Sequence, residues 1–175
     1  RLHGDTVGGT GGLILGAWGA VGTHVHDTHI ASSPYGIDVN PVGDTDTVPP
    51  NINLTLSGVT LINITSGAGI FLRDRATVDT TPSGITMRGI TMRDVQRGIY
   101  VGDGWHGAVI DGASITRCDA SGATRYGIEV RPKAGGCRVR NVIGYDIGAS
   151  NYLVRSQAVS DSAVKATYKA SLVLD

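Results

Sequence analysis

The chain has 175 residues, with 15 acidic and 15 basic side chains and only 17% charged residues. Zero net charge argues against a nucleic-acid partner, which needs a basic surface to neutralise phosphates. No apolar run reaches the length of about 18 residues that would indicate a membrane-spanning helix. The hydrophobic content of 41% argues against disorder, and 26 glycines with few aromatic residues favour an all-β fold rich in turns.

The first recurring motif is a glycine followed by alternating apolar residues, and it begins at Gly12-Leu13-Ile14-Leu15. It returns as Gly36-Ile37-Asp38-Val39, Gly69-Ile70-Phe71-Leu72, Gly98-Ile99-Tyr100-Val101 and Gly127-Ile128-Glu129-Val130. Asn151-Tyr152-Leu153-Val154 continues it with asparagine in the glycine position. Internal repetition at such a period is typical of a solenoid.

A second motif of six residues precedes most copies of the first and reads apolar, any, Gly-like, small or β-branched apolar, any, apolar. Its third positions are Asp27, Gly58, Gly89, Gly112 and Asn141, so the spacings are 31, 31, 23 and 29 residues. In both motifs we expect the repeated Gly or Asn to mark a sharp change of direction at positive φ, which is cheap for these residue types.

Both motifs alternate as short β-strands do, with successive side chains on opposite faces. One coil cannot bury its own apolar face, so equivalent residues of successive coils should stack in inward rows. The predicted rows are Ile37, Ile70, Ile99 and Ile128, and Val39, Leu72, Val101 and Val130. The residues between them, Asp38, Tyr100 and Glu129, are expected to face solvent.

These patterns predict an all-β, right-handed parallel β-helix (β-solenoid) of five to six coils, forming a single domain over residues 1–175. Residues 41–50, 73–83 and 117–126 are interpreted as surface loops that lengthen individual coils. The alternative is a sandwich or barrel of hairpins. Asp103-Gly104 and Asp111-Gly112, the only Asp-Gly pairs, do not bridge two clean strands.

The ends of the chain carry weaker patterns. Residues 155–175 are expected to form a C-terminal strand or capping segment, although Val164, Tyr168 and Leu172 also have helical spacing. The chain opens at Arg1, and we expect it to be a segment of a longer polypeptide. Cys118 and Cys137 fall at different points of their coils and are expected to be buried thiols without a bridge.

The paired motifs resemble the pectin-lyase-like superfamily of parallel β-helix proteins, most clearly in residues 84–92 followed by 98–101. The resemblance covers roughly residues 12–154. It implies the architecture but leaves the activity open, because the superfamily includes polysaccharide lyases, glycoside hydrolases, epimerases, bacterial surface proteins, and phage tailspike and virion proteins.

Hydrolases and lyases of this superfamily work on the outside of the helix, and hydrolysis needs two suitably placed carboxyl groups. Stacking should bring candidate catalytic side chains onto one ridge: Asp74, Asp103, His106, Arg131 and Lys133. Trp105 and Tyr100 are candidates for binding carbohydrate through their rings. The alternative is an ordinary solvated edge of mixed charge.

His24 and His26 flank Val25 and should point to the same face of a strand, where two imidazoles can bind a divalent metal. We otherwise expect no cofactor, and the alternative is a pair of exposed, neutral histidines. Outward threonines such as Thr55 and Thr60 are expected to reflect β-propensity rather than a regular binding array.

The leading functional hypothesis is a structural or adhesive module of a phage or viral particle, such as a tailspike, fibre or capsid-decorating protein. We expect it to be a homotrimer, or to contact other virion subunits, and to lie in the virion or outside the cell. A polysaccharide-degrading or polysaccharide-binding β-helix is the alternative, and a secreted bacterial surface protein is a third possibility.

Overall fold

The structure, a computed structural model, describes residues 2–3, 6–8, 12–16, 22–40, 52–75, 82–118, 126–147, 152–156 and 173–174. Every regular element in these residues is a β-strand. The strands are β1 (Leu2–His3), β2 (Thr6–Gly8), β3 (Leu13–Gly16), β4 (His24–His26), β5 (His29–Ser33), β6 (Ile37–Asn40), β7 (Thr55–Ser57), β8 (Thr60–Leu72), β9 (Thr86–Val101), β10 (Val109–Cys118), β11 (Tyr126–Val130), β12 (Arg138–Ile147), β13 (Tyr152–Ser156) and β14 (Val173–Leu174).

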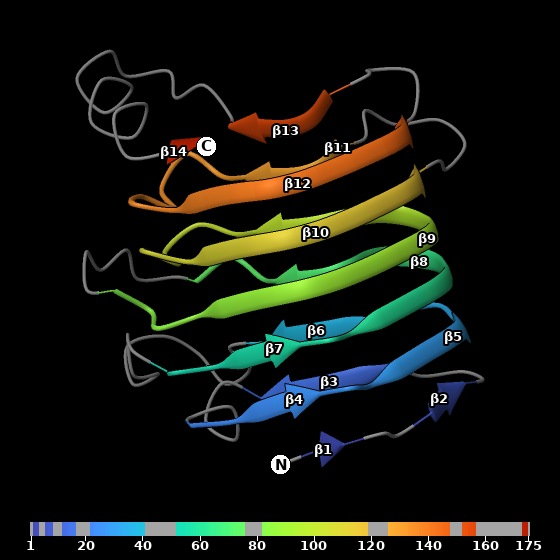
Figure 1. Cartoon of the computed structure of the whole chain (residues 1–175). Coiled ribbons are helices and arrows are strands. Elements are labelled where there is room, and N and C mark those ends of the chain that lie inside the picture. The colour runs from blue at the N-terminus through green and yellow to red at the C-terminus, as the bar shows by residue number, and fades with distance from the viewer. Residues whose placement is uncertain are drawn as a thin grey trace.

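Each strand pairs in parallel with a strand of the next coil, which makes the fold a β-solenoid. Along one side the order is β1-β4-β7-β9-β10-β12-β14, so the ladder advances one coil at a time. Figure 1 shows the chain rising from N- to C-terminus as a right-handed coil, with β3, β6 and β11 behind the front strands. The predicted parallel β-helix is confirmed.

The inner rows predicted from the sequence are present in register. Ile37 pairs with Ile70, Ile70 with Ile99, and Ile99 with Ile128. The second row runs through Val39, Leu72, Val101 and Val130. All these side chains are at most 2% exposed and belong to one continuous core. At roughly 25 cal/mol per Å² of buried apolar surface, burial of these rows contributes to the stability of the fold.

Left-handed residues form columns that mark the turns of successive coils. The predicted column is confirmed, because Asp27, Gly58, Gly89, Gly112 and Asn141 all have φ between 49° and 74°. Two further columns, not predicted from the sequence, lie five residues before and five residues after it. They are Gly22, Asn53, Gly84, Gly107 and Gly136, and Ser32, Asn63, Asp94, Arg117 and Asp146.

The glycine of the first motif is required for a different reason. The positive φ expected there is wrong for Gly36 and Gly98, which do not have left-handed backbones. A Cβ on Gly36 would lie 2.0 Å from the carbonyl oxygen of Gly69, and one on Gly98 would lie 1.9 Å from that of Gly127. Glycine is required here because neighbouring coils approach too closely for a side chain.

The side chains between the inward rows are not solvated as expected. Asp38 is 4% exposed, and Tyr100 and Glu129 are each 8% exposed. The expectation of solvent exposure is therefore wrong at these positions. The side chains that contact Asp38 and Tyr100 are described below.

The last coil is shifted by two residues relative to the sequence alignment. Val154, rather than Tyr152, lies opposite Ile128. A Cβ on Gly144 would lie 2.3 Å from Cδ1 of Leu153, so the half-buried leucine packs against that glycine. Gly144 aligns with Met92 and Ile115 of the preceding coils, and Leu153 lies where a large side chain at position 144 would be.

The structure tests the predictions about the cysteines and about part of the C-terminal segment. Cys118 and Cys137 are buried free thiols, as expected. Val173 and Leu174 form β14 beside β12, and Arg155 and Ser156 end β13. Residues 157–172 of the expected C-terminal segment and the loop at 41–50 lie outside the described residues. In the part of the chain that the structure describes, no helix is long and apolar enough to cross a membrane.

Candidate functional site

The predicted ridge is assembled in part at the ends of β8, β9 and β11. Leu72, Val101 and Val130 are neighbours in one ladder, so the residues that follow them lie side by side. We use the name polar ridge for Asp38, Arg73, Asp74, Tyr100, Asp103, Glu129, Arg131 and Lys133. Asp74 and Lys133 are exposed, and Asp103 and Arg131 are half-buried.

Two of the ridge aspartates, Asp74 and Asp103, bind the backbone of the next coil. The backbone N–H of Asp103 donates to Oδ1 of Asp74 at 2.8 Å, and the N–H of Lys133 donates to Oδ1 of Asp103 at 3.0 Å. Each carboxylate thus links one coil to the following one. A charge-assisted bond of this kind is stronger than a neutral one, so both aspartates have a structural role whatever else they do.

Tyr100 lies within the ridge and does not offer a free ring to a sugar, contrary to expectation. Its ring meets Phe71 edge to face, with centroids 4.9 Å apart, and its hydroxyl donates to Oδ1 of Asp74 at 3.2 Å. Burial, followed by the nearby Asp74 carboxylate, raises the pKa of the Tyr100 hydroxyl well above its ordinary value. Tyr100 therefore acts here as a neutral hydrogen-bond donor.

Trp105 and His106 point into the molecule, which contradicts their predicted places on the exposed ridge. Trp105 is fully buried, its indole N–H donates to the Arg73 carbonyl at 2.6 Å, and the Arg75 guanidinium lies 5.1 Å from its ring centroid. His106 is 7% exposed. The chain turns at Gly104, with φ 82°, and both side chains close the core at this end of the coil.

An ion pair of the ridge joins Asp38 to Arg73, and the sequence analysis did not predict it. The guanidinium donates to both carboxylate oxygens at 2.6 to 3.1 Å and also lies 5.2 Å from the Phe71 ring centroid. The Asp38 side chain is 5% exposed, whereas Arg73 remains 41% exposed. An acidic residue inside an apolar strand, followed one coil later by an arginine, was the available signal.

His24 and His26 flank the buried Val25, which confirms that they share one side of β4. With Gly22, Asp27 and Ser57 they line an open hollow of about 400 Å³, and the His26 Nδ1 lies 3.2 Å from Oδ2 of Asp27. Within the described residues no three potential metal ligands converge. Metal binding by this pair stays a prediction.

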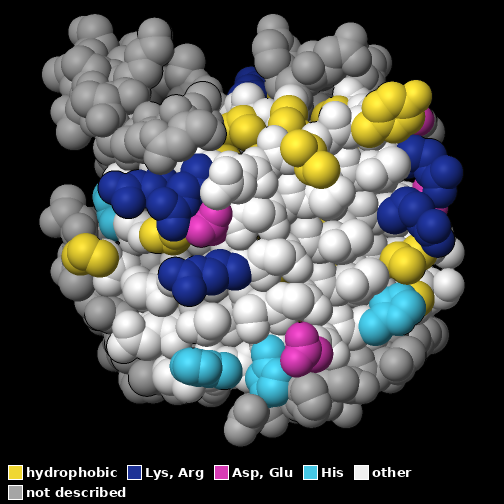
Figure 2. Space-filling model, in the orientation of Figure 1, with side chains coloured by type: hydrophobic (Ala, Val, Ile, Leu, Met, Phe, Trp, Pro, Cys, Tyr) yellow, Lys and Arg dark blue, Asp and Glu magenta, His cyan; other side chains and the backbone are white. Residues whose placement is uncertain are grey.

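Hydroxyl side chains form a more regular outer surface than the sequence indicated. The Thr60–Thr91 pair continues to Ser114, so the expected irregularity is wrong for this column. The Thr55–Thr86 pair lies between His24 and Val109, so the irregularity is present there. Figure 2 shows this face of the molecule, with charged side chains mainly toward its two sides and uncharged atoms between them. We use the name hydroxyl-bearing strip for Thr60, Thr91 and Ser114, which lie in one column of the outer face.

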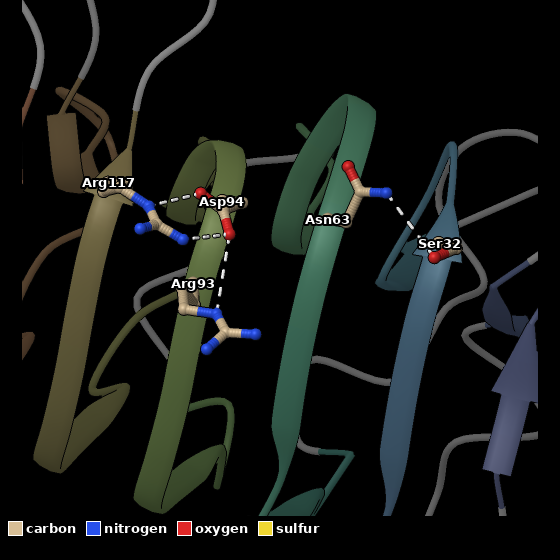
Figure 3. Close-up of polar contacts among 5 residues, drawn as sticks. All are labelled: Ser32, Asn63, Arg93, Asp94 and Arg117. Atoms are coloured by element: carbon tan, nitrogen blue, oxygen red, sulfur yellow. Dashed lines mark hydrogen bonds and ion pairs between the residues drawn. The ribbon is translucent and has the colours of Figure 1, made fainter.

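A polar column at the corner of the solenoid was also missed. It is the left-handed column Ser32, Asn63, Asp94, Arg117 and Asp146. Figure 3 shows two of its contacts: the Asn63 amide donates to the Ser32 Oγ at 3.4 Å, and Arg117 binds both oxygens of Asp94 at 2.5 Å. The recurrence of Asn and Asp at the spacing of the glycine column was the sequence signal.

No family model, curated protein or solved structure matches this chain in the three comparisons made.

Proposed function

We propose that this chain is a structural and adhesive β-solenoid module of a phage or other viral particle, such as a tailspike, fibre or capsid-decorating protein, and that it works as a homotrimer. The observation that carries the proposal is that the polar ridge holds successive coils together. Its acidic groups bind backbone N–H groups and a guanidinium, which joins successive coils into a stiff rod.

The physical argument for a scaffold is the continuity of the fold. In a solenoid each coil contacts only its neighbours, so rigidity over length comes from repeated inter-coil contacts. The inner rows supply the apolar part and the ridge supplies charge-assisted hydrogen bonds on the outside. The hydroxyl-bearing strip offers an adhesive surface, because it presents donors and acceptors without net charge.

Light scattering coupled to size exclusion tests the assembly. We expect one species with three chain masses that persists on dilution. A stable, well-folded monomer at micromolar concentration would contradict the trimer. Adhesion is tested separately by co-sedimentation with cell-surface polysaccharides, where retention without any shortening of the polysaccharide supports the proposal.

A polysaccharide-active enzyme is the second candidate, and the gathering of Asp74, Asp103, Arg131 and Lys133 on one ridge favours it. Two carboxyl groups near cationic side chains are what glycoside hydrolysis or uronate elimination needs. The assay is the release of unsaturated products or new reducing ends from acidic polysaccharides. If the ridge is catalytic, Asp103→Asn should abolish the signal, because an amide keeps the hydrogen-bond acceptor but loses the charge.

Asp27→Asn is the matched control for that variant. Asp27 is exposed and lies on β4's side of the molecule, outside the ridge, and asparagine tolerates its left-handed backbone. If the Asp103→Asn variant still forms product at the original rate, the ridge is not the catalytic site. Polysaccharide retention without product, in contrast, favours the adhesive module.

A further inference from the structure

A hollow lies at the corner of the solenoid, on a different side from the polar ridge. Its volume is about 380 Å³, and Asn63, Ile64, Thr65, Asp94, Gln96, Arg117 and Asp146 line it. These residues belong to β8, β9, β10 and β12, which are neighbours in the ladder. The hollow therefore extends across several coils, as a site for an extended ligand would.

An irregularity of β8 makes room for the hollow. Ile64 pairs with Val95 and Ala68 with Arg97, so residues 65–67 of β8 lie opposite Gln96 alone. The N–H groups of residues 66 and 67 donate to the Pro34 carbonyl of the preceding coil at 3.0 and 3.1 Å. The bulge is thus held toward the coil below, and bulges of this kind often lie beside functional sites.

Arg117 is the unusual member of the left-handed column. Its φ is 52°, a conformation that Asn, Asp and Gly adopt more readily than a long side chain. The guanidinium donates through Nε and one terminal nitrogen to Asp94, which lies one coil below, and it is electrostatically coupled to Asp146, one coil above. Backbone strain that persists at such a position commonly accompanies a functional role.

The lining of the hollow selects for a neutral partner. An anion would meet Asp94 and Asp146, and a cation would meet Arg117, so neither sign of charge is favoured. The amides of Asn63 and Gln96 and the hydroxyl of Thr65 supply both donors and acceptors, and Asp146 adds an exposed carboxylate. A ligand with many hydroxyl groups can satisfy these side chains together.

We propose that this corner hollow binds a neutral saccharide unit, with Arg117, Asp146, Asn63 and Gln96 as its hydrogen-bonding groups. The inference rests on the adhesive function proposed above and names the ligand class and the place of contact. Asp94 positions Arg117 through the bidentate pair shown in Figure 3.

The experiment uses the full chain with cellohexaose, maltohexaose and mannohexaose as neutral probes and an oligogalacturonate as the anionic probe. Affinity is measured by titration calorimetry, and the side-chain amide signals of Asn63 and Gln96 are followed by NMR. Arg117→Asn should weaken binding of a neutral probe about tenfold or more, the scale of losing hydrogen bonds to a charged group. Gln96→Ala should also weaken binding of the neutral probe, and this variant tests the site if Arg117→Asn does not fold.

Arg88→Asn is the matched control, because Arg88 is an exposed arginine on β9 outside the hollow. The affinity of this variant for the neutral probe should equal that of the unmodified chain. Neutral-probe binding that is unchanged in both hollow variants would overturn this site while leaving the adhesive module in place. Binding of oligogalacturonate alone would overturn the ligand class. Failure to bind any saccharide would overturn both the site and the adhesive half of the proposed function, whereas the trimer is judged by light scattering alone.

Discussion

The guanidinium of Arg73 holds both carboxylate oxygens of Asp38, although the two residues lie on different coils. Replacing the buried acid by Asp38→Asn leaves the half-exposed arginine without its charged partner. We expect a loss of about 1 to 2 kcal/mol in the free energy of unfolding, which is less than for a fully buried pair because water still reaches Arg73. Urea unfolding measures the change.

Asp27→Asn is the control for this substitution, because Asp27 is exposed and its left-handed backbone suits asparagine. The free energy of unfolding of this variant should stay within about 0.5 kcal/mol of that of the original chain. Equal losses in the two variants would mean that the Asp38–Arg73 pair adds nothing specific.

Close approach of coils makes Gly98 sensitive to any side chain. A Cβ there would lie 1.9 Å from the Gly127 carbonyl oxygen, so Gly98→Ala must push two coils apart at an expected cost of about 3 kcal/mol. In Gly22→Ala the Cβ has open space and only the positive φ resists it, at about 1 kcal/mol. Denaturant unfolding of the two variants should reproduce this order, and the reverse order would refute the steric explanation.

The inner row predicts the cost of truncating an apolar side chain. Ile99→Ala should destabilise the fold by about 3 kcal/mol, because Ile99 is 1% exposed and its neighbours cannot collapse around the cavity. Ile143, at 68% exposed, lies on the outer face of β12, and Ile143→Ala should change stability by no more than about 0.5 kcal/mol. Similar thermal midpoints for the two variants would be incompatible with the register described here.

Acid should weaken the corner column. A hydrogen bond from Arg117 lowers the pKa of the Asp94 carboxyl below its ordinary value of 3.8. The contribution of this carboxylate to stability is complete above the unfolded-state pKa and is lost as pH falls through the lower folded-state pKa. The thermal midpoint should therefore drop between about pH 5 and pH 2.5, and Asp94→Asn should make that drop shallower. Parallel pH profiles for the two proteins would count against this linkage.

Burial should protect both thiols from modification. Cys118 and Cys137 are free, and burial raises the pKa of the Cys137 thiol to about 11. At about pH 8 an alkylating reagent should react slowly with the folded chain and rapidly, at both cysteines, in denaturant without reductant. Mass spectrometry counts the labels, and a chain that took up none in denaturant would contain a disulfide instead.

Periodicity could predict the fold because the inner rows depend on local alternation and on repeats within the chain. The positions of Ile70 and Ile99 follow from their motifs alone. The burial of Trp105 could not be predicted from its motif, because a turn at Gly104 decides whether an aromatic residue beside a strand faces water or the core. The Asp38–Arg73 pair and the Asp94–Arg117 pair depend on the register between coils of unequal length, which only the folded chain fixes.

The two kinds of glycine column also look alike in a sequence. Gly89 is required by its left-handed backbone and Gly98 by the carbonyl oxygen of a neighbouring coil, yet both recur with their coils. Asparagine replaces glycine in both motifs, at Asn141 and at Asn151, so the sequence alone does not separate them. The corner column could be predicted, because Asn63 and Asp94 recur at the same spacing as Gly58 and Gly89.

In the five coils whose turns the structure describes, the three left-handed columns keep a constant separation of five residues, while the distance to the next coil varies from 23 to 31 residues. All variation in length therefore falls outside the stretch from the first column to the third. A whole period, such as residues 84–106, could be removed so that Gly107 stacks directly on Asn53 with every turn still aligned. The reach of this rod is thus adjustable in discrete steps by gain or loss of complete units, without redesign of the units that remain.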